Sequence, residues 1–226
     1  MLLLIPIPFF YAAYAAAVAV VAIFSVPLIK NLFKEAPQRI LVLGLNQSGK
    51  TTLHNSLRGK GIKESYCQTP NCCDLEEFEM EYKGTKIKFG KSKDIPGDLN
   101  NQIAALNKNV KEFFKNEESG LIIYLVNCND IDKPELIEHA GRVLGRAFEF
   151  FSKANVAIIY SHPDEVGKTK KDLADIRNNL FLNRLSTRYP TLAERLRESE
   201  LHYMANLTEK EQSQEVMMEI FQKIKK

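Results

Sequence analysis

The stretch Gly44–Thr52 holds the residues of this chain whose types and spacing most clearly indicate chemistry. Gly44, Gly49, Lys50 and Thr51 fit the pattern G-x-x-x-x-G-K-[ST], a loop that binds phosphate groups. Its glycines let the backbone turn tightly so that consecutive N–H groups point at an anion, and the start of a helix adds partial positive charge. Lys50 can then reach the β- and γ-phosphates of a nucleoside triphosphate, while the Thr51 hydroxyl can ligate Mg²⁺. The other residues of the loop expected to contact the nucleotide are Asn46, Gln47, Ser48 and Thr52.

Such a loop needs a strand before it and a helix after it. Arg39–Gly44 is a short apolar run with β-branched residues, which predicts a strand. Gly49–Arg58 is predicted to be a helix that Gly59 and Gly61 end. The alternative is a glycine-containing turn between strand and helix with an incidental lysine. Because the strand, the spacing and the helix all agree, we favour phosphate binding.

Beyond this loop, short apolar runs alternate with amphipathic stretches. Leu75–Tyr82 and Thr85–Gly90 flank Lys83-Gly84 as an antiparallel hairpin, after an irregular loop over Lys63–Cys73. Further strands are expected over Leu121–Val126, Asn155–Tyr160 and Leu201–Ala205. Further helices are expected over Asn101–Lys115, Pro134–Ser152, Lys170–Arg188, Thr191–Arg197 and Glu209–Lys225. This alternation predicts an α/β fold with a mostly parallel sheet and helices on both faces. Together with the Gly44–Thr52 loop, it indicates a fold of the P-loop NTPase type.

In an open α/β sheet, ligands bind at the carboxyl ends of the strands, and several polar residues are expected there. Asp94, expected to follow the second hairpin strand, can hold Mg²⁺ through water, and Gly97 can offer its backbone N–H to a γ-phosphate. The Thr69 hydroxyl can also bind Mg²⁺ if the triphosphate orders its loop. The alternatives are plain turns at Asp94–Gly97 and at Thr69-Pro70-Asn71, because proline and glycine favour turns.

A second group of residues could recognise a nucleobase. Ser161-His162-Pro163-Asp164 follows one buried strand, and Asp164 can accept hydrogen bonds from the N1–H and the amino group of a guanine. Ala205 ends the last strand, where a backbone N–H could meet the carbonyl oxygen of the base. The alternative for Asp164 is a surface turn, because proline and aspartate favour turns.

The order of these motifs, from Arg39 to the C-terminus, resembles that of the small GTPases. It is most similar to the Arf-like branch and to the β-subunit of the signal recognition particle receptor. Gly44–Thr52 resembles the first motif of the family, Thr69 its switch I threonine, and Asp94–Gly97 its D-x-x-G motif. The resemblance implies a G-domain that binds GTP and GDP with Mg²⁺ and has two switch loops that partners recognise.

Two departures from the family pattern affect the expected chemistry. The base motif N-K-x-D is present as Ser161-His162-Pro163-Asp164, where only the aspartate is kept and His162 could stack on the base in place of a lysine stem. Asp98 stands where many members carry a glutamine that orients the attacking water. A carboxylate could orient water too, but it brings negative charge near the γ-phosphate. With Lys50 and Asp98 as the candidate catalytic residues, we expect slow intrinsic hydrolysis.

The first 29 residues form a stretch without any charge. Met1–Ile29 is long enough to cross the roughly 30 Å hydrocarbon core as one helix. A cleaved signal peptide is the first alternative, although no basic residue precedes the apolar run. A buried core helix is the second, although such a helix is usually amphipathic. We expect a transmembrane anchor, followed by a linker over residues 30–38 and a GTPase-like domain over residues 39–226. Lys30 and Lys34 then place this domain in the cytoplasm.

Three functions remain open at this stage. The first is a membrane-anchored GTP-binding switch that recruits an unknown cytosolic partner, and the second is a nucleotide-bound scaffold with little or no hydrolysis. The third is a P-loop ATPase or kinase. A kinase would carry its second aspartate on a parallel strand and have a lid rich in arginine, and the early hairpin and the Asp94–Gly97 loop count against it. The net charge of +3, with both signs interspersed, gives no reason to expect nucleic acid.

Overall fold

The computed structural model describes residues 40–60, 73–110, 120–152 and 154–224. These residues belong to one compact unit, Pro37–Ile224. The expected anchor, its linker, Thr69 and nearly all of the loop Lys63–Cys73 lie outside the described residues. Among the helices that are described, none has an apolar stretch long enough to span a bilayer.

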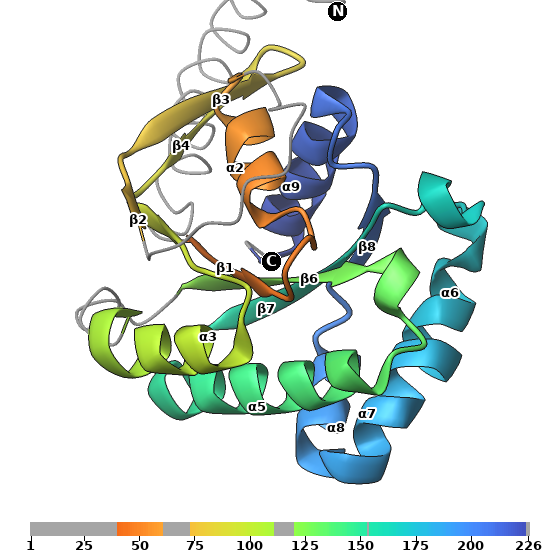
Figure 1. Cartoon of the computed structure of the whole chain (residues 1–226). Helices are drawn as coiled ribbons and strands as arrows, with labels where there is room; N and C mark the ends of the chain where they lie inside the picture. The colour runs from red at the N-terminus through yellow and green to blue at the C-terminus, as the bar shows by residue number, and fades with distance from the viewer. Residues whose placement is uncertain (1–39, 61–72, 111–119, 153, 225–226) are drawn as a thin grey trace, which may run out of the picture. The chain divides into compact units, whose positions relative to one another are not determined.

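A six-stranded sheet forms the centre of the described unit, in the order β2-β5-β1-β6-β7-β8 (Figure 1). Five neighbouring strands run parallel, and β2 pairs antiparallel with β5 at one edge. The strands are β1 (Ile40–Gly44), β2 (Cys73–Leu75), β5 (Ser92–Asp94), β6 (Leu121–Asn127), β7 (Asn155–Ser161) and β8 (His202–Ala205). The predicted mostly parallel sheet is therefore confirmed.

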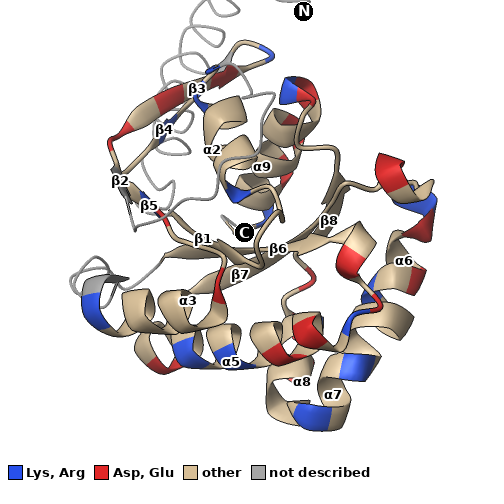
Figure 2. Ribbon diagram, viewed as in Figure 1, with Lys and Arg blue, Asp and Glu red and all other residues tan. Residues whose placement is uncertain are grey.

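Helices cover both faces of this sheet, as the alternating pattern predicted. Figure 1 shows α2 and α9 on one side and α3, α5, α7 and α8 on the other. Their bounds are α2 (Lys50–Leu57), α3 (Leu99–Ala105), α5 (Pro134–Phe150), α6 (Leu173–Asp175), α7 (Asn183–Arg188), α8 (Pro190–Glu198) and α9 (Lys210–Ile224). Figure 2 shows acidic and basic residues mixed along the outer helices.

The central strands β1, β6 and β7 are apolar almost throughout because both of their faces are buried. Successive side chains of a strand point to opposite faces. Leu41, Tyr124 and Tyr160 belong to the cluster that packs on α5, α7 and α8. Val42 and Ile123 are equally buried and face the side of α2 and α9. Because these strands are parallel, their carboxyl ends lie along one edge of the sheet.

The segment before Asp94 differs from the prediction. The expected hairpin exists as β3 (Phe78–Tyr82) and β4 (Thr85–Phe89), but these two strands form a separate sheet. Asp94 instead ends β5, which pairs parallel with β1 so that Val42 lies opposite Asp94. Asp94 does follow the second hairpin strand along the chain, but the parallel strand β5, which the sequence did not predict, lies between them and carries it. Because a kinase would also carry its second aspartate on a parallel strand, the position of Asp94 does not argue against a kinase.

Three other boundaries differ for local reasons. The expected strand Leu75–Tyr82 is interrupted after β2 and begins again at Phe78. The helix expected from Asn101 begins at Leu99, since Asp98 caps it, and its hydrogen bonding becomes π-helical over Leu106–Val110. The helix expected over Lys170–Arg188 keeps its helical course but passes through a 3₁₀ turn, α6 and a π-helical segment, Ile176–Leu182, before α7.

Candidate nucleotide-binding site

The turn between β1 and α2 has the backbone that a phosphate loop requires. Gly44 and Gly49 have φ values of +143° and +91°, which favour glycine. A Cβ atom on Gly44 would lie 2.6 Å from the Leu125 carbonyl oxygen, and one on Gly49 would lie 2.9 Å from Leu207 Cδ1. Gln47 is also in the left-handed region, with φ at +62°. Gly44 and Gly49 therefore stand at positions where both the backbone conformation and the lack of room for a Cβ atom require glycine.

Lys50 begins α2 and lies almost wholly buried beneath this loop. Its Nζ donates hydrogen bonds to the carbonyl oxygens of Gly44, at 3.0 Å, and Leu45, at 2.8 Å. Burial lowers the pKa of Lys50 to about 8, and the nearby Asp94 charge opposes that shift. The ammonium group is thus held inside the loop at the position from which it could contact phosphates.

The two candidate Mg²⁺ ligands within the described residues lie next to each other. Thr51 Oγ1 donates a hydrogen bond to Asp94 Oδ2 at 3.0 Å, although 43 positions separate them in the chain. Thr51 comes from α2 and Asp94 from the end of β5, and the pairing of β5 with β1 brings them together. A hydroxyl and a carboxylate are hard oxygen donors, which is the kind of ligand Mg²⁺ prefers. These residues therefore fit the ion directly or through water.

Gly97 and Asp98 connect β5 to α3 beside the phosphate loop. A Cβ atom on Gly97 would lie 2.4 Å from the backbone nitrogen of Asn46, so the glycine allows close contact between the two loops. Asp98 is the N-cap of α3, and its Oδ1 accepts a hydrogen bond from the Asn101 backbone nitrogen at 3.0 Å. The structure thus gives the Asp98 carboxylate a structural role that the sequence motif did not indicate.

Gln102 is a residue of this site that the sequence analysis missed. It lies on α3, is fully buried, and its Nε2 donates to the Gly44 carbonyl oxygen at 2.7 Å. A glutamine within an amphipathic helix gives no motif by itself. Its polar side chain at a buried helix position was the available signal, because buried polar groups need partners.

Residues at the carboxyl ends of β6 and β7, and His162 directly after β7, also contact the phosphate loop. Ser161 Oγ donates to the Ser48 carbonyl oxygen at 2.9 Å, and Asn127 Nδ2 donates to the Gln47 carbonyl oxygen at 3.2 Å. His162, with φ at +55°, has its Nδ1 3.1 Å from Glu165 Oε1. Its Nε2 would lie 3.6 Å from a Cβ atom on Gly49. The altered base motif is therefore packed against the phosphate loop.

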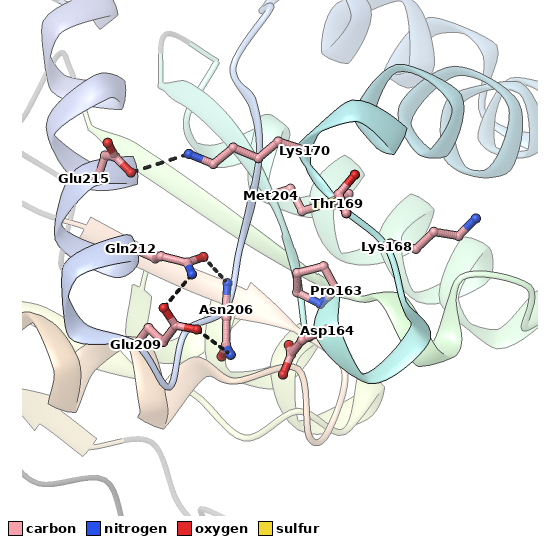
Figure 3. A pocket seen from close by; sticks show the side chains of 10 residues that line it. All are labelled: Pro163, Asp164, Lys168, Thr169, Lys170, Met204, Asn206, Glu209, Gln212 and Glu215. Carbon is pink, nitrogen blue, oxygen red and sulfur yellow. Dashed lines mark hydrogen bonds and ion pairs between the residues drawn. The ribbon is translucent and has the colours of Figure 1, made fainter.

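Asp164 lines a cavity of about 420 Å³ between the loop after β7 and the start of α9 (Figure 3). Asn206, directly after Ala205, lines the same cavity, and its backbone nitrogen donates to Gln212 Oε1 at 3.0 Å. Glu209 in turn accepts from the side chains of Gln212 and Asn206. The residues lining the cavity are Pro163, Asp164, Lys168, Thr169, Lys170, Met204, Asn206, Glu209, Gln212 and Glu215. The structure thus brings Asp164 and the end of β8 to one place.

A phosphate loop, a Thr–Asp pair and a D-x-x-G turn at the carboxyl edge of a parallel sheet define a P-loop protein of the small GTPase superfamily. The sequence profile of the ADP-ribosylation factor family matches residues 25–193, and the chain belongs to this family, within the Arf-like branch. This assignment, rather than the position of Asp94, separates the chain from P-loop kinases.

One solved structure similar to this chain is that of Methanosarcina barkeri Roco2 RocCORdC bound to GDP. The TM-score is 0.49 at 18% sequence identity, covering 84% of this chain and 50% of the other. The present chain thus spans half the length of that chain. No curated protein matches the sequence.

Proposed function

We propose that this chain is a GTP-binding switch that uses Mg²⁺ and hydrolyses GTP slowly. The observation that carries the proposal is the geometry around Lys50 and the Thr51–Asp94 pair, whose oxygens lie 3.0 Å apart below the phosphate loop. Small GTPases bind GTP with Mg²⁺, and this chain has a matching set of phosphate-facing and Mg²⁺-facing groups at the carboxyl edge of its sheet.

Each residue of the site has a distinct task in this proposal. The loop N–H groups and the Lys50 ammonium neutralise the phosphates, and Thr51 and Asp94 hold the metal. Bound Mg²⁺ would be held by Thr51 and Asp94 and would supply positive charge that offsets the charge of the phosphates. The Gly97 backbone N–H faces the terminal phosphate, so that the turn before α3 senses whether this phosphate is present.

Guanine is the proposed base because of Asp164. A carboxylate that accepts from N1–H and from the exocyclic amino group disfavours adenine, which lacks that pair of donors. Ser161 and His162 pack on the phosphate loop in place of the usual Asn and Lys, so we expect weaker selection of guanine than a full N-K-x-D motif would give. His162 and the backbone near Ala205 complete this proposed base site.

We further propose a single-pass anchor over residues 1–29, with the GTPase-like domain in the cytoplasm recruiting a protein partner to the membrane. The uncharged stretch and the lysines that follow it support this arrangement. Carbonate extraction of membranes that contain the full chain tests it. The wild type should stay in the pellet, whereas a variant with Val18→Asp and Val20→Asp should be released. Release of both proteins would contradict the anchor.

Thermal unfolding of the full chain in detergent micelles tests nucleotide binding. GTPγS or GDP with Mg²⁺ should raise the melting temperature, because a ligand at about 100 times its Kd adds about 2.7 kcal/mol. Lys50→Ala should lose this gain, while Lys133→Ala, which changes an exposed lysine paired with Asp130, should keep it. An equal effect of ATPγS would contradict the choice of guanine. No effect of any nucleotide would overturn the proposed function.

A scaffold that stays loaded with nucleotide is the second candidate, because the Asp98 carboxylate is engaged in capping α3. Single-turnover hydrolysis with the full chain separates the two functions. A switch should hydrolyse GTP slowly but measurably, and Asp98→Gln should accelerate hydrolysis by supplying the amide that orients water in related GTPases. Absence of hydrolysis in both proteins would favour the scaffold.

A further inference from the structure

Gln102 links α3 to the phosphate loop through a buried hydrogen bond. Its Nε2 lies 2.7 Å from the Gly44 carbonyl oxygen, which also accepts from Lys50 Nζ at 3.0 Å. Because a carbonyl oxygen can only accept, the amide must present its nitrogen there. The Gln102 side chain is fully buried, and its Oε1 makes no hydrogen bond with any described residue. A buried amide that meets only part of its hydrogen-bonding capacity is costly, which points to a role beyond packing.

Gln102 lies between two groups that would face the terminal phosphate in the proposed nucleotide complex. Gly97 and Asp98 directly precede α3, and Gln102 lies one helical turn after Asp98, to whose carbonyl oxygen its backbone nitrogen donates at 2.9 Å. The side-chain bond from Gln102 to Gly44 therefore fixes the first turn of α3 relative to the loop that holds Lys50. The link thus joins the helix that follows Gly97 to the loop that holds Lys50.

The shared acceptor also connects Gln102 to the movement of Lys50. The ammonium has three N–H donors, two of which face the carbonyl oxygens of Gly44 and Leu45. A bound triphosphate would draw the ammonium toward its oxygens and weaken these bonds. Gln102 would then keep the Gly44 carbonyl oxygen paired, which lowers the cost of moving Lys50.

We propose that Gln102 is a positioning residue that favours a triphosphate over a diphosphate. It holds α3 so that the Gly97 N–H and the Lys50 ammonium converge on the terminal phosphate, and it keeps the Gly44 carbonyl oxygen satisfied when Lys50 turns. This inference rests on the proposed nucleotide-binding function. The hydrogen bond from Gln102 to Gly44 connects α3 directly to the phosphate loop, separately from the Gly97 turn.

The test compares GTPγS and GDP affinities of the full chain and of Gln102→Met, a substitution that keeps the length of the side chain but removes the amide. Calorimetry with Mg²⁺ present gives the two dissociation constants. The Kd for GTPγS should rise about fivefold more than the Kd for GDP, the factor expected from one net hydrogen bond. Equal changes in the two constants would reduce Gln102 to a structural residue and overturn the proposal.

Hydrogen exchange of the nucleotide-free protein provides a second readout. Backbone amides of Leu99–Ala105 should exchange faster in Gln102→Met than in the wild type. The control is Asn100→Ala, a change on the exposed side of the same helix, in which these amides should exchange at the wild-type rate. Unchanged exchange in Gln102→Met would also contradict the link.

Gln102→Glu keeps the inference falsifiable if the methionine variant fails to fold. A buried carboxylate would draw Lys50 away from the position of the terminal phosphate and should weaken GTPγS binding more than GDP binding, which removes the triphosphate preference; a retained preference would count against the proposal. If the wild type itself bound neither nucleotide, the proposed function would be wrong. That outcome differs from one in which the wild type binds both nucleotides but the Gln102 variants keep the triphosphate preference, which would contradict only the role of Gln102.

Discussion

Thr51 Oγ1 donates a hydrogen bond to Asp94 Oδ2 at 3.0 Å, which closes the candidate metal site across two elements that are far apart in the sequence. Thr51 is placed by the start of α2, and Asp94 by the parallel pairing of β5 with β1. The contact shows that the end of β5, rather than the hairpin, supplies the carboxylate. It also makes the metal dependence of nucleotide binding a direct test of the site.

Asp94→Asn should weaken binding of Mg²⁺ with GTPγS by about 10–100-fold, the range seen when the outer ligands of a metal site are lost. The asparagine keeps the size of the side chain and can still accept from Thr51, but it loses the charge that attracts the cation. Titration of GTPγS in Mg²⁺ and in EDTA measures the effect.

The variant should bind nearly as weakly in Mg²⁺ as the wild type does in EDTA. Asp130→Asn is the matched control, because Asp130 pairs with the exposed Lys133. A wild-type response to Mg²⁺ in Asp94→Asn would exclude Asp94 from the metal site.

The phosphate loop could be predicted from sequence because its signals are local. Gly44, Gly49 and Lys50 stand at fixed spacing between an apolar run and a helix, and the loop geometry depends mainly on their own backbone angles. The hairpin was predicted for the same reason, since Lys83-Gly84 specifies a tight turn between two strands. The buried strands β6 and β7 were predicted from continuous apolar runs.

The parts that the sequence did not reveal depend on distant pairings. Ser92–Asp94 is short and polar, and only its pairing with β1 on one side and β2 on the other makes it a strand. Gln102 became recognisable as a site residue only when α3 was placed against Gly44. The capping role of Asp98 was not evident for a different reason, because the helix was expected from Asn101, whereas it begins at Leu99, directly after Asp98.

Gly97→Ala should destabilise the protein by about 1–3 kcal/mol, the usual cost of overpacking. The new Cβ atom would lie 2.4 Å from the Asn46 backbone nitrogen and 2.7 Å from its Cα atom, and backbone atoms cannot rotate away. Urea unfolding measures the change. Gly145→Ala on α5 is the control, because nothing lies within 4 Å of its new Cβ atom. It should stabilise the protein by about 0.5–1 kcal/mol. Equal effects of the two changes would contradict the close contact at Gly97.

Asp98→Ala should lower the free energy of unfolding by about 1 kcal/mol because α3 loses its N-cap. Asp98→Asn should stay close to the wild type, since asparagine accepts the same hydrogen bond from the Asn101 backbone nitrogen. Urea unfolding of the three proteins side by side separates capping from charge. If the asparagine variant lost as much stability as the alanine variant, the charge of Asp98 and not its cap would be what stabilises this turn.

Three buried histidines make the stability of the domain depend on pH. Burial is the main cause that lowers the pKa values of His54, His139 and His202 to about 4. His139 accepts or donates a hydrogen bond of 2.8 Å with Tyr124, and His202 bonds Leu196 through its second nitrogen. The unfolded chain binds protons at its histidines below about pH 6.5, whereas the folded chain does not until about pH 4. The contribution of these histidines to stability should therefore be constant above the unfolded pKa and should fall as the pH drops from about 6.5 toward 4.

His139→Gln should reduce this pH dependence. Below the unfolded pKa, one such histidine lowers the free energy of unfolding by about 1.4 kcal/mol per pH unit. Between pH 7 and pH 5 the loss is therefore up to about 2 kcal/mol. The glutamine can still bond the Tyr124 hydroxyl, so the variant should fold, with a lower stability at pH 7 because its shape differs from that of the imidazole. Urea unfolding at several pH values between 5 and 7 gives the slope for each protein. A slope in His139→Gln as steep as that of the wild type would mean that His139 already takes up a proton in the folded state.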